Sequence, residues 1–298
     1  MNRAEFYLED LASKFTKINP NDYYLAYSGG RDSHFLLWFI RQYLGNKSIP
    51  AVFCNTGMEI PEIRTRALYN ADIVLKPTLK HAEIKERFGI PLDSKASDEY
   101  VYYYQNYKRQ GMTDEEMPAR VKYNAMRIVD ATERGRKTGL LPFSVVNKKT
   151  SEAMMAGTLH NVSHLCCKYL KKEPAHEYEK TSGRKAILGI MGTESTNRKS
   201  KYTSCFSKNG KFHPLWDLTE ELRNEIEDYC GIEIPHIYRY TNQTGCAGCP
   251  YGQHGKDAYK KTDIDLTFCM DGQRDFILKF FGESYKFKGY HFQPIMFL

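Results

Sequence analysis

Six consecutive residues, Ser28-Gly29-Gly30-Arg31-Asp32-Ser33, combine residue types that can hold an anion. An apolar run from Tyr23 to Tyr27 leads into them and a helix is expected from about Asp32 to Leu44, which predicts a strand, a tight turn and a helix. Adjacent glycines let the backbone approach a ligand, and the first amides of a helix attract phosphate. The segment therefore predicts a phosphate-binding loop, although a glycine turn capped by serines fits the same residues.

Two further polar loops follow strand candidates. Residues 49–54 read as a buried strand that ends in the loop N-T-G-M-E-I-P-E at residues 55–62, and a helix is expected from Pro61 because proline suits the first helical turn. Residues 185–190 read as another strand, followed by G-T-E-S-T-N-R at residues 192–198. Glu59, Glu62 and Glu194 are candidates for metal or ribose contacts and fit loop surface equally well, whereas Arg198 can stabilise charge on a phosphate.

Four of the eight cysteines occur as two close pairs, the adjacent Cys166 and Cys167 and the C-x-x-C of Cys246 and Cys249. Four thiolates suit zinc or an iron-sulfur cluster. Adjacent cysteines cannot easily both bind one tetrahedral zinc ion, whereas a 4Fe-4S cube offers separate iron corners. We therefore predict a 4Fe-4S cluster, with zinc as the second choice and buried thiols used as small apolar side chains as the structural alternative.

The other cysteines carry weaker signals. Cys205 follows the third polar loop and is a candidate for a ligand or for a thiolate that carries sulfur as a persulfide. Cys54 is expected in the core of a strand. Cys230 and Cys269 have no partner pattern and are expected to be structural.

The elements around these residues indicate an α/β protein with a doubly wound parallel sheet, because strand candidates alternate with helix candidates. Additional strands are expected at residues 72–75 and 141–146, and additional helices within residues 1–22, at 79–88, around the adjacent cysteines and at 219–229. We expect residues 1–240 to form a nucleotide-binding α/β domain with a helical insertion at about 93–140. Residues 241–298 are expected to form a cysteine-rich C-terminal segment packed on the same domain.

The insertion mixes tyrosines, six of them between Tyr100 and Tyr123, with lysines and arginines. Such a mixture can stack bases and hold phosphates, which favours a nucleic-acid substrate. A helical insertion with a solvated charged face has the same composition, so both interpretations stand.

Composition sets broad limits on the class of protein. At 298 residues with 41% hydrophobic residues, the chain can build a substantial core. It shows no signal peptide and no apolar run long enough to cross a membrane, so we expect a cytoplasmic protein with reduced thiols and no membrane partner. The formal net charge of +7 suits an anionic ligand such as a nucleotide and is compatible with nucleic acid.

Four blocks in order give the chain a resemblance to a known family. Residues 28–33 resemble the pyrophosphate (PP) loop of N-type ATP pyrophosphatases, and neither G-x-x-x-x-G-K-S/T nor G-x-G-x-x-G occurs. Residues 55–62 resemble D-T-G-x-x-x-P-E, residues 192–198 resemble G-x-x-x-E-S-x-x-R, and the C-C with C-x-x-C set completes the pattern. Together these blocks, at about residues 20–255, resemble the phosphoadenosine phosphosulfate (PAPS) reductase superfamily, in particular its phage and bacterial reductase-like branch related to DNA phosphorothioation sulfur-transfer proteins.

The resemblance implies a fold like that of the adenine nucleotide alpha hydrolases and an enzyme that binds ATP with Mg²⁺. It also implies a 4Fe-4S cluster, which the same cysteine set holds in adenylylsulfate (APS) reductases. The residues expected to bind the nucleotide are Ser28, Gly29, Gly30, Arg31, Asp32, Ser33, Thr56, Gly57, Glu59, Glu194 and Arg198. Asp32, Arg198 and Cys205 are the catalytic candidates.

The chain departs from sulfonucleotide reductases because it lacks their C-terminal E-C-G-x-H, whereas it keeps the S-G-G-x-D-S form typical of ATP users. We therefore expect cleavage of ATP to AMP and pyrophosphate, which activates a substrate for sulfur transfer. A true PAPS or APS reductase that releases sulfite, with its nucleophile moved to Cys269 or Cys205, is the main alternative. A non-catalytic nucleic-acid-binding module with a structural metal is the second. The expected partners are an adenine nucleotide, a nucleic-acid substrate and a sulfur donor protein.

Overall fold

The computed structural model describes residues 2–127, 145–194, 204–253 and 258–296. The chain forms two compact units, and each unit is built from two separate stretches of sequence. Unit 1 contains residues 1–77 and 171–244, and unit 2 contains residues 78–170 and 245–298. The sequence-based division instead kept residues 78–170 with the N-terminal domain.

Unit 1 is built on a four-stranded parallel sheet with the order β3-β2-β1-β4. Leu25 of the central strand β1 pairs with Ala51 of β2 on one side and with Ile187 of β4 on the other. The predicted α/β class with a parallel sheet is thus confirmed. The strands are β1 (Tyr23–Ala26), β2 (Ala51–Cys54), β3 (Ile73–Leu75) and β4 (Lys185–Ile187).

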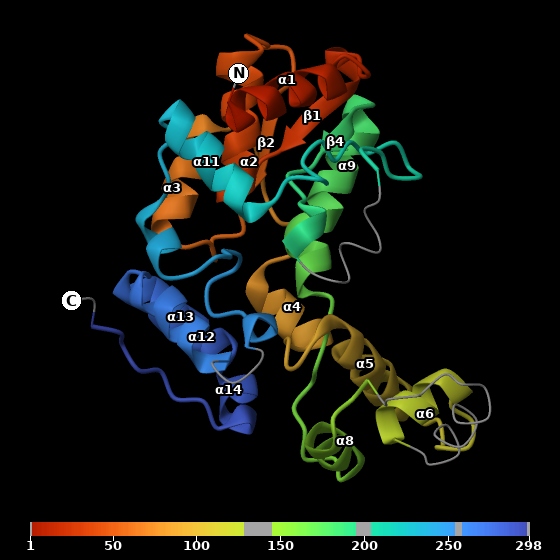
Figure 1. Ribbon diagram of the computed structural model, residues 1–298. Helices are drawn as coiled ribbons and strands as arrows, with labels where there is room; N and C mark the ends of the chain where they lie inside the picture. Colours follow the sequence, from red (N-terminus) through yellow and green to blue (C-terminus); the bar gives the residue numbers. More distant parts are fainter. Residues whose placement is uncertain (1, 128–144, 195–203, 254–257, 297–298) are drawn as a thin grey trace. The chain divides into compact units, whose positions relative to one another are not determined.

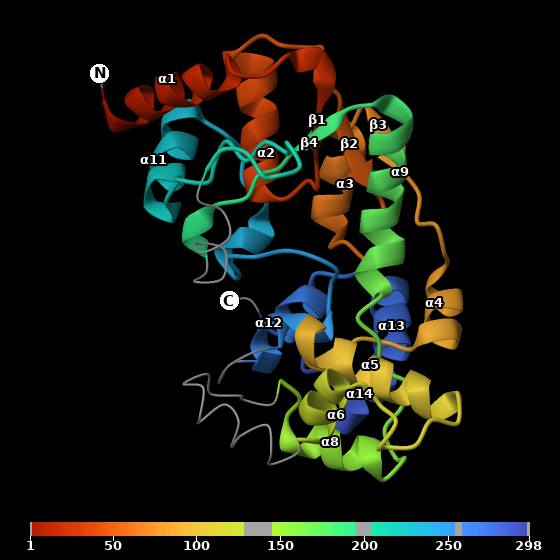
Figure 2. The same ribbon diagram turned by 90° about the vertical axis from the view of Figure 1, so that its right-hand side faces the viewer.

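Both faces of the sheet are covered, as expected when nearly every strand residue is apolar. Alternate residues of β1 point to opposite faces: Leu25 belongs to a large core cluster with helices α1, α2, α3 and α11, and Tyr24 packs against Tyr178 of α9. Figures 1 and 2 show α9 on the opposite side of the sheet from α1, α2 and α11. The helices are α1 (Arg3–Phe15), α2 (Arg31–Trp38), α3 (Pro61–Asn70), α9 (Glu173–Ser182) and α11 (Glu220–Cys230).

Several short helical segments extend or connect these elements. The predicted helix to Leu44 is present, but its last part is a π-helix, η2 (Phe39–Tyr43). Another π-helix, η3 (Lys168–Lys172), directly follows the adjacent cysteines, which lie in the helix predicted to carry them. The 3₁₀ turns are η1 (Pro20–Asp22), η4 (Gly192–Glu194), η5 (His236–Arg239) and η6 (Pro250–Gly252).

Unit 2 is helical in its described part and has its own core. That core gathers Leu92, Val101, Val146 and Val162, and Phe287 near the C-terminus packs against it. This packing explains why residues 78–170 join the C-terminal residues in one unit. The helices are α4 (His81–Phe88), α5 (Lys95–Arg109), α6 (Ala119–Met126), α8 (Lys148–Met155), α12 (Ala258–Thr267), α13 (Asp271–Phe280) and α14 (Gly282–Lys288).

Two of the sequence-based predictions concern segments of unit 2. Residues 141–144 of the strand candidate lie outside the described residues, and residues 145–146 form a bend in which Val146 is fully buried. In the tyrosine-rich insertion, Tyr104 is 4% exposed and Tyr100, Tyr103 and Tyr107 pack against the unit 2 core. These four tyrosines of α5 contribute to the packing of unit 2, and both interpretations of the insertion stay predictions.

Within the described residues, no helix is both long enough and apolar enough to span a bilayer.

Candidate functional site

The loop at the end of β1 has a conformation that depends on its glycines. Gly29 has φ +74°, and a Cβ there would lie 2.5 Å from the carbonyl oxygen of Ile63, so a larger residue would be both strained and crowded. Gly30 then precedes α2 as its N-cap. The predicted strand, glycine turn and helix are all present.

Two serine hydroxyls fix the shape of this loop from inside. The Oγ atoms of Ser28 and Ser33 lie 3.0 Å apart, and Ser33 Oγ accepts the amide of Ser28 at 3.2 Å. Ser33 Oγ also lies 3.0 Å from the carbonyl oxygen of Gly30, to which it can donate. The amide of Gly30 donates to Ser28 Oγ at 3.3 Å. These bonds close the turn without a ligand.

A cavity of about 400 Å³ opens beside the loop. Its walls come from the residues that follow β1 and from those that follow β4, such as Gly189. The sheet order reverses between these two strands, and open parallel sheets bind ligands at the carboxyl ends of strands at such a point. Its lining includes Ser28, Gly30, Arg31, Asp32, Ser33, Glu220, Arg223, Tyr238 and Thr244.

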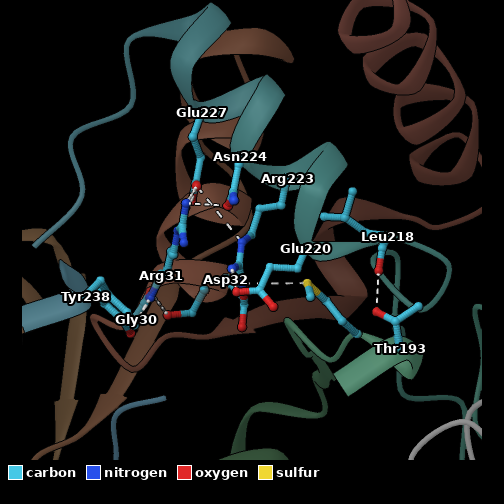
Figure 3. Close-up of polar contacts among 12 residues, drawn as sticks. Gly30, Arg31, Asp32, Thr193, Leu218, Glu220, Arg223, Asn224, Glu227 and Tyr238 are labelled. Atoms are coloured by element: carbon cyan, nitrogen blue, oxygen red, sulfur yellow. Dashed lines mark hydrogen bonds and ion pairs between the residues drawn. The ribbon is translucent and has the colours of Figure 1, made fainter. Parts of the chain in front are cut away.

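Helix α11 contributes a buried cation and a buried anion to this region (Figure 3). Arg223, 4% exposed, donates through Nη1 to Oδ1 of Asp32 at 2.5 Å. Glu227, 1% exposed, accepts two bonds from Nε of Arg31, at 2.7 and 3.0 Å, and a further bond from Nη2. Arg31 also donates to Asn224 at 2.7 Å. The two neighbouring loop side chains are thus both tied to α11.

The charges in this network compensate one another. Burial raises the pKa of Glu227, and the hydrogen bond and charge of Arg31 act against that rise. Arg223 lies 4.0 Å from Glu227 as well, so each buried charge has an opposite charge nearby. The sequence analysis gave Asp32 a role in positioning a metal, and here one of its oxygens is engaged by Arg223.

Tyr238 brings a hydroxyl group to the start of α2. Its Oη accepts the backbone amide of Arg31 at 2.9 Å and lies 2.8 Å from Oγ1 of Thr244. Burial raises the pKa of Tyr238, so the group is a neutral phenol near neutral pH.

The second predicted loop is well ordered by its own bonds. Thr56 donates to Glu59 at 2.7 Å, Gly57 has φ +77°, and Glu59 is 3% exposed with Lys171 Nζ at 3.4 Å. Among the described residues that line the cavity, Thr56, Gly57 and Glu59 are absent. Glu62 accepts the amides of His236 and Ile237 at the start of η5.

Only part of the third predicted loop is described. Gly192–Glu194 form η4, and Thr193 donates to the carbonyl oxygen of Leu218 at 2.8 Å. Arg198 lies outside the described residues, and for Glu194 the description covers only the backbone. Both assignments stay predictions.

The four paired cysteines all belong to unit 2. Burial, followed by the charge of Asp98, raises the pKa of the Tyr251 phenol, and Cys249 and Cys167 contribute smaller effects in the same direction, so a thiol from each pair lies in the surroundings of Tyr251. Tyr285 donates to the carbonyl oxygen of Gly248 and holds the C-x-x-C turn. In the described part of the chain, however, no group of three or more His, Cys, Asp or Glu side chains is arranged to hold a metal ion. The 4Fe-4S cluster and its four cysteine ligands stay predictions.

Cys205 belongs to unit 1, where its Sγ accepts the indole N–H of Trp216 at 3.1 Å. It packs against the large core cluster, as does Cys230. Burial raises the pKa of the Cys54 thiol to about 11 and that of Cys269 to about 12, which keeps both thiols protonated near neutral pH. None of the eight cysteines forms a disulfide.

Sequence reasoning did not find Arg223, Glu227 and Tyr238 as site residues. The helix at 219–229 was predicted, and Arg223 and Glu227 are four residues apart, so they share a face of that helix. This spacing was the available signal, but nothing in it shows that the face turns toward residues 31 and 32.

Comparison with known proteins adds one structural likeness. No protein-family model matches the chain, and no curated protein matches it. Among solved structures, the chain is similar to phosphoadenylyl-sulfate (PAPS) reductase from Candida auris, solved as a phosphate complex. The TM-score is 0.39 and the sequence identity 12%, over 80% of this chain and 93% of that chain. At this TM-score the likeness carries no argument about activity or ligands.

Proposed function

We propose that the chain is a PP-loop enzyme of the PAPS reductase superfamily that cleaves ATP to AMP and pyrophosphate to activate a substrate for sulfur transfer. The observation that carries this proposal is the cavity at the carboxyl ends of β1 and β4, which has the S-G-G-R-D-S loop in its wall. Its volume of about 400 Å³ falls in the range of small-molecule pockets. The first amides of α2 face the same loop.

The charged side chains that line the cavity support a nucleotide bound as a metal complex. Among the described lining residues, Arg31 and Arg223 are balanced by Asp32 and Glu220. A triphosphate therefore needs Mg²⁺, or a cation such as Arg198, to offset its charge. In the proposed complex, Ser28, Gly29, Gly30 and Ser33 hold the β- and γ-phosphates.

The chemistry follows from that placement. An acceptor oxygen attacks the α-phosphorus, the bond from that phosphorus to the bridging oxygen breaks, and pyrophosphate leaves with the bonding electrons. The acceptor releases its proton to solvent. A sulfide or thiol nucleophile then takes the place of the activated oxygen, which leaves with AMP. The 4Fe-4S cluster stays a prediction, and none of these steps depends on it.

The test is release of pyrophosphate from ATP by the purified protein in the presence of Mg²⁺. Ser28→Ala combined with Asp32→Ala should abolish release, because the change removes a loop hydroxyl and the carboxylate beside the cavity. Ser48→Ala is the control, since Ser48 is exposed in a different loop of unit 1. Unchanged release in the double variant would remove the enzyme interpretation.

The same preparation separates ATP cleavage from reduction. Sulfite release from PAPS or APS that depends on thioredoxin, without pyrophosphate release from ATP, would establish a sulfonucleotide reductase in place of our proposal.

A further inference from the structure

The hydroxyl of Tyr238 stands where the phosphate loop meets the cavity. It accepts the N–H of Arg31, the first amide of α2, at 2.9 Å. A Cβ placed on Gly30 would lie 3.1 Å from this hydroxyl and 3.4 Å from that of Thr244. Both hydroxyl groups therefore lie against the loop backbone, and both residues line the cavity.

Contacts within unit 1 hold the segment that carries Tyr238. It lies in η5, whose first amides, those of His236 and Ile237, donate to the carboxylate of Glu62 on α3 at 2.6 and 3.2 Å. Ile237 is fully buried. A hydroxyl held in this way loses little conformational freedom when it binds a ligand.

A second group in the same cavity points to an anion independently of the helix. The side chain of Arg223 is 5% exposed, and its Nε makes no hydrogen bond within the described part of the chain. The carboxylate of Glu227 lies 4.0 Å from this Nε, and Nη1 donates to Asp32. Arg223 thus brings a buried positive charge to the lining of the cavity, which suits a negatively charged ligand.

We propose that Tyr238 is a phosphate-binding residue of this site. Its hydroxyl relays a hydrogen bond from the Arg31 amide to a phosphate oxygen of the nucleotide. This inference rests on the proposed function. The phenol oxygen accepts from the amide, and its own proton then points to the ligand. In this relay the phosphate oxygen takes the place of the Thr244 hydroxyl, whose Oγ1 lies 2.8 Å from Tyr238 Oη. A chain of donors of this kind strengthens each of its bonds.

Calorimetric titration with inorganic pyrophosphate and with ATP, each with Mg²⁺, tests the relay. Tyr238→Phe keeps the ring and removes the hydroxyl, and it should weaken both ligands by about tenfold, the scale of a hydrogen bond to a charged group. Thr244→Val should leave both affinities close to wild type, because Thr244 is displaced on binding. Tyr229→Phe is the control, since Tyr229 is 54% exposed and donates to Glu5.

Each other outcome overturns the relay. If Tyr238→Phe binds both ligands as tightly as wild type, Tyr238 does not bind phosphate. A loss for ATP without a loss for pyrophosphate places Tyr238 at the nucleoside instead. A loss in Thr244→Val as large as that in Tyr238→Phe makes the pair structural. A wild-type protein that binds neither ligand overturns the proposed function together with the relay, whereas the first three outcomes leave that function standing.

Discussion

At the scale of single residues, the loop divides its side chains between two tasks. Ser28 and Ser33 turn inward and close the loop, whereas Arg31 and Asp32 reach toward α11. The observed bonds from Arg31 to Glu227 and Asn224 use the planar fork of a guanidinium, which an ammonium group does not offer. These bonds give a structural explanation for an arginine at position 31.

His34, in the first turns of α2, gives a prediction about pH. Its Nδ1 lies 3.0 Å from the hydroxyl of Tyr27, and burial, followed by the charge of Arg66, lowers its pKa to about 4. The unfolded chain, with a histidine pKa near 6.5, therefore binds a proton more readily than the folded chain between these values. This contribution to stability is complete above about pH 6.5 and is lost as the pH falls toward 4. His34→Gln should make the midpoint temperature of thermal unfolding less dependent on pH across this window.

Comparison of His34→Gln with wild type separates the effect of His34 on the pH dependence of stability from the effects of other titratable groups. Burial raises the pKa of Asp98 to about 6, so that carboxyl group contributes in the opposite direction, with stability rising as the pH falls below 6. His176→Gln is the matched control, because the side chain of His176 is 79% exposed. Equal slopes in His34→Gln and wild type would show that His34 does not titrate in this way.

The residue types of the loop could be predicted from sequence, but their partners could not. The S-G-G-R-D-S segment forms a local turn, and its glycine and serine pattern is sufficient to place it between a strand and a helix. The bonds of Asp32 to Arg223 and of Arg31 to Tyr238 join residues far apart in the chain. Such pairs depend on which helix packs beside α2, and a single sequence contains no direct signal for that choice.

At the scale of elements, α11 acts as a brace for the phosphate loop. Glu227 is the only buried anion of this helix within the described residues, and it faces both Arg31 and Arg223. Glu227→Gln should lower the free energy of unfolding by about 3 kcal/mol, because it removes the buried carboxylate that pairs with Arg31 and lies beside Arg223. Denaturant unfolding measures this change.

Glu225 provides a control on the same helix. Its ion pair with Arg3 joins two exposed side chains, so Glu225→Gln should cost less than about 1 kcal/mol. Equal losses of unfolding free energy in the two variants would mean that loss of any carboxylate destabilises helix α11. The buried ion pairs would then contribute no more than the exposed one.

Helices and strands could be predicted where the pattern of apolar residues along the sequence matches the burial of those residues in the fold. The two central strands, β1 and β2, are mostly buried, and their continuous apolar runs were recognised. The run at residues 141–146 carries the same kind of signal, but only residues 145 and 146 are described, and Val146 lies in a bend that packs in the core of unit 2. The π-helices also escaped prediction, because η2 and η3 continue helical patterns and differ only in hydrogen-bond register.

At the scale of the whole molecule, the chain leaves unit 1 after residue 77 and returns to it at residue 171. This path brings both cysteine pairs into unit 2, although most of the sequence between them belongs to unit 1. The sequence motif predicted that the pairs act together, and their common unit is consistent with that. The 4Fe-4S cluster that the motif implies therefore stays a prediction about two pairs of thiols in one unit.

Metal analysis and a visible spectrum after anaerobic purification test this prediction. About four irons per chain with broad visible absorption support the cluster, whereas one zinc ion without colour overturns it. Cys246→Ser should remove the metal, and Cys230→Ser, on α11 in unit 1, should not. Because bonds from a cluster to both cysteine pairs restrain the C-x-x-C turn, the loaded protein should also show slower amide hydrogen exchange at residues 246–253 than the metal-free protein. Metal bound with unchanged exchange there would mean that the ion sits elsewhere and that these four cysteines are small buried side chains of unit 2.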